Sequence, residues 1–240
     1  RPPWYGFASG PAIPVDSAVT RPRPAAGGGR WLDVAPERLA GWLADFDGRH
    51  GVVRSVYTPA LVTFEAADGA LAEFHPPFPP LSHDGAHEGA VGEPLLAHAC
   101  RDRVVGVLLV RLGGHAAGVF EGERLVAAKV GSRLVHGRHA AGGWSQLRFA
   151  RRRAGQARVA ARAAADDAAR VLVPALPALE AVVLGGDRRA VEPLRADPRL
   201  AGVFALAVDR FLATREPRRA VLERSAAAFR AVRVRLVADY

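Results

Sequence analysis

The residues best suited to chemistry lie together in the stretch HGRHAAGGWSQLRFARRR, which begins at His136. Two adjacent glycines, Gly142 and Gly143, stand directly before Trp-Ser-Gln. Glycine lets a backbone approach a partner where a Cβ atom would clash. Arginines at 148, 151, 152 and 153 follow at once, and clustered arginine indicates a polyanionic partner. The stretch therefore predicts a closely approaching loop followed by a basic anchor.

The same residues also have an ordinary structural interpretation. The glycines could form a simple turn, with Ser145 as the cap of the following helix and the arginines as a solvated helix face. The residues on both sides of the loop favour the functional interpretation, because they extend the pattern beyond a short glycine motif.

The stretch resembles the catalytic domain of eukaryotic and archaeal class I peptide-chain release factors, whose hallmark is HGRGGQSALRFARxR. The matching positions are His136, Gly137, Arg138, Gly142, Gly143, Ser145, Leu147, Arg148, Phe149, Ala150, Arg151 and Arg153. Residues 139–141 are inserted, and Trp144 occupies the position of the family's catalytic Gln, with Gln146 two residues later. A displaced Gln is similar to the release-factor-like peptidyl-tRNA hydrolases of ribosome quality control, the VLRF group, which includes actinobacterial members.

The resemblance implies a peptidyl-tRNA hydrolase that cleaves the ester between nascent peptide and tRNA in the peptidyl-transferase centre. Gln146 would orient water while Gly142 and Gly143 shape the loop, because a Gln amide can position and polarise but cannot act as a base. The partners would be the large ribosomal subunit with its RNA, and peptidyl-tRNA. The expected RNA-binding residues are Arg138, Trp144, Arg148, Arg151, Arg152 and Arg153. We expect no cofactor and no metal.

Codon reading is not expected of this chain. The Asn-Ile-Lys-Ser motif of stop-codon decoding domains cannot occur here, since the sequence contains no Asn. Release would then be codon-independent, which suits the rescue of stalled ribosomal complexes.

Two alternatives remain open. One is a non-catalytic RNA- or ribosome-binding module, and the other is a metal-dependent hydrolase that uses His83, Asp84, His87 and Glu88 in a Pro/Gly-rich loop.

Composition agrees with a globular protein that binds an anion. Of the 240 residues, 50% are hydrophobic, the formal charge is +9, and Lys129 is the only lysine. A G+C-rich genome would also enrich arginine, so abundance alone proves little. The single cysteine, Cys100, excludes an intramolecular disulfide, and we expect it to be a buried small apolar residue. With no apolar run of membrane length and no signal peptide, we expect a cytoplasmic protein with neither membrane nor DNA as partner.

Periodicity predicts the elements that must position the motif. We expect an extended arm at 1–30 and a small α+β subdomain at 31–95, with a helix from residue 35, a hairpin over 52–74 and a Pro/Gly-rich connection at 75–94. Residues 96–240 would form an α/β domain with a mixed sheet, like the release-factor catalytic domain. Its expected elements begin with three strands over 104–131, joined by hairpin turns at Gly113-Gly114-His115 and at Glu121-Gly122. They continue with a loop at 137–143, a helix over 145–173, a buried strand ending at Gly186, a helix capped by Asp187, a strand near 203–210 and a C-terminal helix from Pro217.

Overall fold

The computed structural model describes residues 13–15, 22–111, 113–132 and 145–237, with the backbone alone at 145–153. The chain forms two compact units. The first combines Arg1–Asp16 with Arg103–Ala226, and the second combines Ser17–Asp102 with Ala227–Tyr240. Each unit thus contains segments that are far apart in the sequence.

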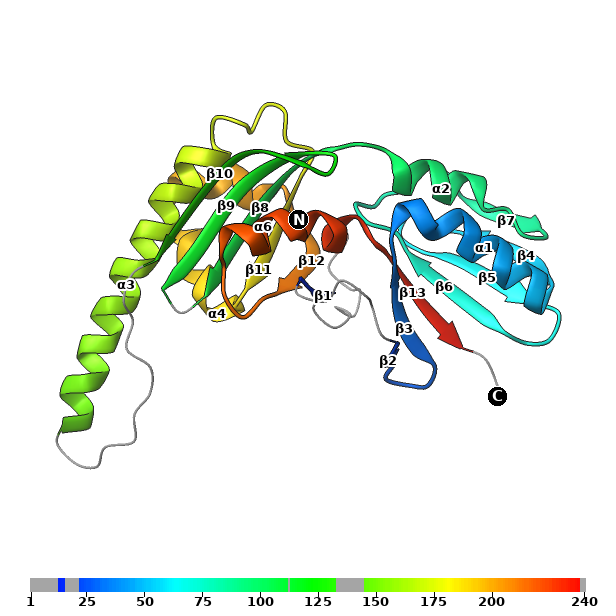
Figure 1. The fold of residues 1–240 in the computed structure, drawn as a ribbon, viewed down its shortest axis with the longest axis horizontal. Helices are drawn as coiled ribbons and strands as arrows, with labels where there is room; N and C mark the ends of the chain where they lie inside the picture. Colours follow the sequence, from blue (N-terminus) through cyan, green and yellow to red (C-terminus); the bar gives the residue numbers. More distant parts are fainter. Residues whose placement is uncertain (1–12, 16–21, 112, 133–144, 238–240) are drawn as a thin grey trace. The chain divides into compact units, whose positions relative to one another are not determined.

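The first unit contains a mixed sheet in the order β1-β12-β11-β8-β9-β10 (Figure 1). Its four neighbouring strands β1, β12, β11 and β8 run parallel, whereas β8, β9 and β10 form antiparallel pairs. The strands are β1 (Ile13–Pro14), β8 (Val104–Arg111), β9 (Gly114–Glu121), β10 (Arg124–Ser132), β11 (Ala181–Gly186) and β12 (Ala207–Ala213). This mixed α/β architecture confirms the predicted fold class.

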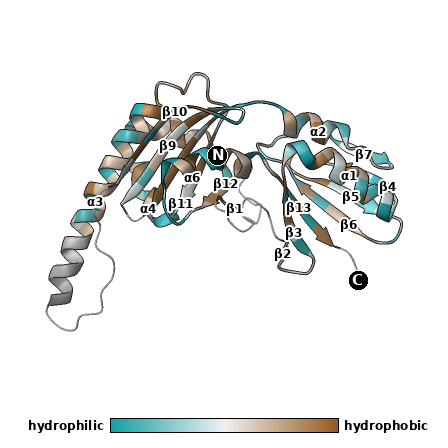
Figure 2. Ribbon diagram, in the orientation of Figure 1, coloured by the Kyte–Doolittle hydropathy of each residue, from teal (hydrophilic) through white to brown (hydrophobic). Residues whose placement is uncertain are grey.

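Helices cover both faces of this sheet. They are α3 (Ser145–Leu172), α4 (Arg188–Val191), the 3-10 turns η1 (Glu192–Ala196) and η2 (Pro198–Leu200), α5 (Ala201–Ala205) and α6 (Arg219–Arg230). Ala117 and Val119 of β9 share a core with Ala164 and Ala168 of α3. A Cβ atom on the intervening Gly118 would instead meet Leu222 of α6 at 3.0 Å, so α6 lies on the opposite face. The strand between them, β9, is buried from residue 115 to residue 120, although it mixes hydrophobic and hydrophilic residues, as its varied colours in Figure 2 show.

The second unit is an antiparallel sheet in the order β2-β3-β13-β6-β5-β4-β7. Its core joins Leu39, Leu43 and Phe46 of α1 and Leu95 of α2 to the alternate, buried residues of the strands. The elements are β2 (Arg23–Pro24), β3 (Arg30–Val34), α1 (Pro36–His50), β4 (Val52–Tyr57), β5 (Val62–Ala66), β6 (Leu71–His75), β7 (Gly85–Glu88), α2 (Glu93–Cys100) and β13 (Val232–Val237). None of the helices described in either unit is long and apolar enough to cross a membrane.

The predicted C-terminal helix is correct only in part. Helix α6 ends at Arg230, and β13 then pairs with both β3 and β6 of the second unit. The physical reason is the period of two in VRVRLV, in which Val232, Val234 and Leu236 are buried while the arginines between them are partly exposed, with side-chain exposures of 12% and 24%. The last strand therefore belongs with residues 17–102, whereas a continuous 96–240 domain was expected.

Two further local predictions differ from the structure. The 75–94 connection contains β7 and the start of α2, and the division between units falls after Asp102. Cys100 was expected to be buried, but it is exposed at the end of α2, where its Sγ lies 3.8 Å from the carbonyl oxygen of Pro36. Its position in the last turn of an amphipathic helix explains the exposure, since Ala99 takes the buried position.

Candidate functional site

The glycine-rich motif leads directly into α3. This helix begins at Ser145, as predicted, and its first three turns carry the backbone of Gln146, Arg148 and residues 151–153. Gly142, Gly143, Trp144 and Arg138 lie outside the described residues, as does the loop predicted at 137–143. The described site is therefore the helix that carries the motif and the contacts that hold this helix on the sheet.

Among the α3 residues whose side chains are described, 154–172, those that pack against the sheet lie in the C-terminal half. Buried residues begin at Ala160 and continue with Ala164, Ala165, Ala168 and Leu172. The described residues before them, 154–159, are exposed or half-exposed, and Val159 retains 61% of its surface. A helix of 28 residues is about 42 Å long, so a large part of α3 extends beyond the sheet edge (Figure 1). The sequence start of this helix lies at its extended end.

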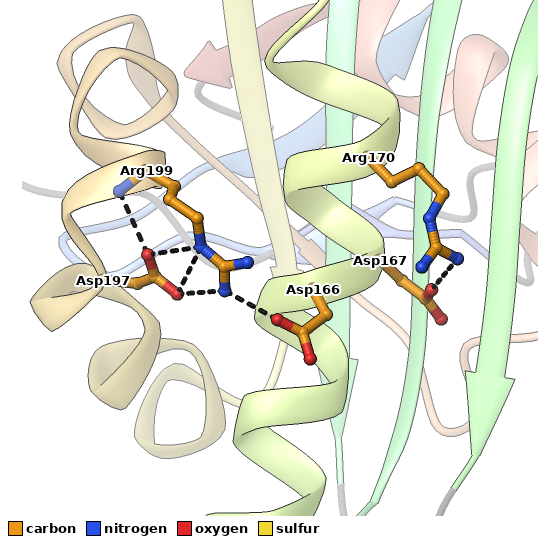
Figure 3. Close-up of polar contacts among 5 residues, drawn as sticks. All are labelled: Asp166, Asp167, Arg170, Asp197 and Arg199. Atoms are coloured by element: carbon orange, nitrogen blue, oxygen red, sulfur yellow. Dashed lines mark hydrogen bonds and ion pairs between the residues drawn. The ribbon is translucent and has the colours of Figure 1, made fainter.

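An ion-pair network holds one side of the packed half of α3. Arg199 in η2 donates to Asp166 of α3 at 2.7 Å and to Asp197 at 2.7 Å, which Figure 3 shows as one guanidinium between two carboxylates. Asp197 also accepts from the backbone N–H of Arg199 at 3.0 Å and so caps the short η2 turn. The hydrogen bond from the Arg199 side chain is the main cause that lowers the pKa of Asp197 below its ordinary value. The same pairing raises the pKa of Arg199, so the Arg199–Asp197 pair stays charged under ordinary conditions.

The next residue holds the other side of the helix. Asp167 Oδ2 lies 2.9 Å from Nε2 of His115 in β9, and its second oxygen accepts from Arg170 at 3.1 Å. His115 is only 2% exposed. The neighbouring β10 residue is Gly131, where a Cβ atom would lie 2.5 Å from His115 Nε2 and 3.0 Å from Asp167 Oδ2. Glycine is thus required at 131 to leave space for this buried pair.

Together, the contacts of Asp166 and Asp167 fix the rotation of α3 about its own axis. Adjacent residues of an α-helix point about 100° apart, so the two carboxylates reach different neighbours, as Figure 3 shows. Asp166 contacts the segment after β11, and Asp167 contacts the sheet. These contacts determine the direction in which the extended half of α3 presents its residues. We call Asp166, Asp167, His115 and Arg199 the α3 clamp.

Two glycine-containing turns of the first unit are explained by packing. Gly113 has φ of 84° between β8 and β9, which confirms the predicted hairpin turn. At Gly186, φ is 94° and a Cβ atom would lie 2.1 Å from the carbonyl oxygen of Val110. Asp187 then accepts from the N–H of Arg189 and caps α4, as predicted. Strand packing therefore accounts for Gly185 and Gly186 without a bound phosphate.

The loop considered for metal binding contains a pair of stacked histidines. The rings of His83 and His87 have centroids 4.8 Å apart, with their Nε2 atoms separated by 2.9 Å. Both rings pack edge-on against Tyr57. Burial raises the pKa of Tyr57 to about 12. Asp84 and Glu88 do not complete a ligand set with this pair, since no group of three or more His, Cys, Asp or Glu that could hold a metal occurs in the described part of the chain.

Sequence reasoning did not identify the α3 clamp. Asp166 and Asp167 are the only acidic residues between 145 and 172, so their isolation in a run of Ala and Arg was an available signal. His115 was assigned only to a hairpin turn, and Arg199 carried no recognisable pattern. Their roles depend on contacts between segments separated by 33 to 52 residues.

The match to a protein family concerns mainly the first unit. A profile of the family described as acVLRF1, the Actinobacteria/chloroflexi VLRF1 release factor, matches residues 103–235. No curated protein is significantly similar in sequence.

Solved structures show remote similarity. The crystal structure of the archaeal translation termination factor aRF1 is 14% identical, with a TM-score of 0.41 and coverage of 81% of this chain and 70% of that chain. A structure described only as an archaeal protein is 12% identical, with a TM-score of 0.37 and coverage of 82% and 73%. Pelota of Archaeoglobus fulgidus is 13% identical, with a TM-score of 0.29 and coverage of 88% and 66%.

Proposed function

The chain belongs to the Actinobacteria/chloroflexi VLRF1 release factor family, and we propose that it is a codon-independent peptidyl-tRNA hydrolase acting on stalled ribosomal complexes in the cytoplasm. The observation that carries this proposal is the position of the family match. Its range, 103–235, includes the whole HGR…GGWSQLRFARRR stretch and the helix that follows it. The release-factor-like part of the chain therefore coincides with its most chemically distinctive segment.

The proposed reaction is hydrolysis of the ester between the nascent peptide and the ribose of the tRNA. Water attacks the ester carbonyl carbon, the bond to the ribose oxygen breaks, and the proton from water passes to the departing hydroxyl group. Gln146 has no titratable nitrogen, so its role is to orient this water and stabilise the developing oxyanion through its amide. Gly142 and Gly143 would allow the loop backbone to approach the ester.

The helix provides the second part of the proposal. Because α3 begins at Ser145, the backbone of Gln146 stands at the start of a long rigid element. The α3 clamp is near the opposite end of this helix, so α3 can act as an arm that carries the motif into a narrow RNA-lined centre. Arg138, Trp144, Arg148, Arg151, Arg152 and Arg153 would then contact ribosomal RNA or tRNA near the reacting ester.

A release assay tests this function directly. Purified protein is incubated with large ribosomal subunits that carry peptidyl-tRNA and no codon in the A site, and free tRNA is separated from ester-linked tRNA. We expect release by the wild-type protein and a decrease of roughly 100-fold or more for Gln146→Ala, by analogy with the loss of one oxyanion donor. Subunit binding and thermal stability should stay near the wild-type values. Equal release by Gln146→Ala and wild type would contradict the catalytic role.

Two controls separate the remaining alternatives. If the protein binds subunits but never releases peptide, it is a ribosome-binding module, which the displaced Gln makes the nearest competitor. If a chelator selective for transition metals over magnesium abolishes release, a metal-dependent mechanism replaces the one proposed here. We expect full activity in the presence of that chelator.

A further inference from the structure

The arginines of α3 and its neighbours differ in whether they have an acidic partner. Arg170, Arg195 and Arg199 are each paired with a carboxylate, at 3.1, 3.2 and 2.7 Å. Arg158 and Arg162 are exposed, and neither forms a hydrogen bond or ion pair with any residue that the structure describes. Arginines near the α3 clamp therefore form ion pairs. Arg158 and Arg162, which lie closer to the start of the helix, form none with the described residues.

Arg162 has no partner among the described residues, although an acidic residue is near in sequence. Asp166 stands four residues after Arg162, a spacing at which helix ion pairs form. Its carboxylate instead accepts from Arg199 at 2.7 Å. No acidic residue occurs between 145 and 165, so Arg158 has no partner available within three or four residues on α3. The fold thus leaves two full positive charges on this part of the helix.

These two arginines and one glycine share a side of α3. Positions 155, 158 and 162 are separated by three and four residues, which places them on one stripe of an α-helix. Ala160 and Ala164, on the side facing the sheet, are buried. Position 151, four residues before Gly155, continues the same stripe into the motif region. We call Gly155, Arg158 and Arg162 the α3 stripe.

Nothing in the part of the chain that the structure describes explains a glycine at position 155. No atom of the described residues lies within 4 Å of the place where its Cβ would stand. A glycine inside a helix nevertheless destabilises it relative to alanine. A glycine with open space at its Cβ position, on the same side of the helix as positive charges, is useful where another backbone must approach closely, because any side chain there would hold that backbone away.

We propose that the α3 stripe binds the phosphate backbone of RNA, with Arg158 and Arg162 on phosphate oxygens and the RNA backbone lying over Gly155. The choice of ribosomal RNA as the source rests on the proposed function, and the chemistry rests on the stripe itself. A planar guanidinium binds phosphate through two parallel hydrogen bonds. The overall charge of +9 also favours a polyanion. The RNA contact surface thereby extends beyond the motif arginines, toward the packed half of α3.

Salt dependence of binding provides the first test. Binding to purified large ribosomal subunits is measured at several salt concentrations for Arg158→Gln/Arg162→Gln and for a matched control, Arg170→Gln/Arg195→Gln, which removes equal charge from paired arginines. Two lost phosphate contacts should decrease the slope of log affinity against log salt by about 1.4 to 1.8. When the salt concentration rises roughly fourfold, the affinity of the Arg158→Gln/Arg162→Gln variant should therefore fall by a factor about ten times smaller than that of the wild type. The control should keep the wild-type slope.

Substitution of the glycine provides the second test. Gly155→Leu should fold at least as stably as wild type, because leucine is a better helix former, yet bind large subunits at least roughly tenfold more weakly. Its control is Gly41→Leu in α1, where the Cβ position is also open. Ribosomal RNA freed of protein should compete with subunits for the wild-type protein and compete less well for the Arg158/Arg162 variant.

The binding experiments on the α3 stripe can succeed or fail independently of the release assay. Equal slopes for the two double variants, or unchanged binding of Gly155→Leu, would overturn the α3 stripe even if peptide release is normal. Competition that is identical for the wild type and the Arg158/Arg162 variant would assign the surface to something other than RNA. Absence of release combined with the expected binding results would instead reject the hydrolase and retain the stripe.

Discussion

The Nε2 atom of His115 and the Oδ2 atom of Asp167 lie 2.9 Å apart, and this contact joins β9 to α3. His115 is almost completely buried, so its hydrogen-bonding atoms cannot rely on solvent. The contact lies 22 residues after the start of α3 at Ser145. A pair that belongs to the core of the first unit therefore helps to set the direction of the helix that carries the motif.

The two adjacent aspartates of the clamp should differ in their contribution to stability. Asp167→Ala leaves a buried histidine without its partner, and we expect the free energy of unfolding to fall by about 1–3 kcal/mol. Asp166→Ala removes an exposed ion pair worth about 0–1 kcal/mol while gaining helix propensity, so its net effect should be close to zero. Hydrogen exchange of the β9 and β10 amides measures the stability of the first unit alone. Equal losses for both variants would refute the assigned roles.

The Arg199–Asp197 pair predicts acid sensitivity of the first unit. The pKa of Asp197 in the folded state is below its ordinary value of 3.8, with the Arg199 hydrogen bond as the main cause. The folded state therefore favours the ionised form, and the stabilisation is present above the unfolded pKa and lost as the pH falls through the folded pKa. Melting temperatures of wild type and Asp197→Asn should converge as the solution is acidified below about pH 4. Curves that stay parallel down to strongly acidic pH would contradict this assignment.

Tyr57 predicts the opposite pH dependence in the second unit. Burial raises its pKa from 10.0 to about 12, so the folded state favours the protonated phenol. Stability from this group is complete below the unfolded pKa and is lost as the pH rises from 10 through 12. Difference ultraviolet spectra of wild type against Tyr57→Phe should show this phenol ionising late, together with unfolding of the second unit. Ionisation near pH 10 without unfolding would show that the phenol is accessible to solvent.

The motif residues other than Gln146 should have graded effects on release. Gly143→Val adds a branched side chain where close backbone approach is proposed, so we expect release to be strongly impaired. Trp144→Ala should have a smaller effect than Gln146→Ala, because indole offers one donor and no acceptor. Single-turnover release with saturating protein separates these effects from changes in binding. If Trp144→Ala were inactive while Gln146→Ala remained active, the central role would belong to Trp144 and not to Gln146.

Elements whose patterns are local could be predicted from the sequence alone. Helix α3 was predicted from a long run without proline, and its observed start at Ser145 agrees. The hairpins of β8, β9 and β10 followed from alternating residues and glycine turns, and the cap at Asp187 followed from its residue type. These features depend on neighbours within a few residues, which is why one sequence is enough to predict them. The motif and its resemblance to release factors were likewise readable without coordinates.

The way in which distant segments combine became known only from the three-dimensional structure. The structure assigned β13 to the second unit through pairs with β3 and β6, although the alternating VRVRLV pattern follows a helix without a turn signal. It also decided which arginines of α3 have partners, because Asp166 is nearer in sequence to Arg162 but bonds to Arg199. Burial of His115 beside Gly131 depends in the same way on strand register. Pairing energies between distant residues depend on distances that a sequence pattern does not contain, and these pairings set the direction of α3 and the charge on its exposed side.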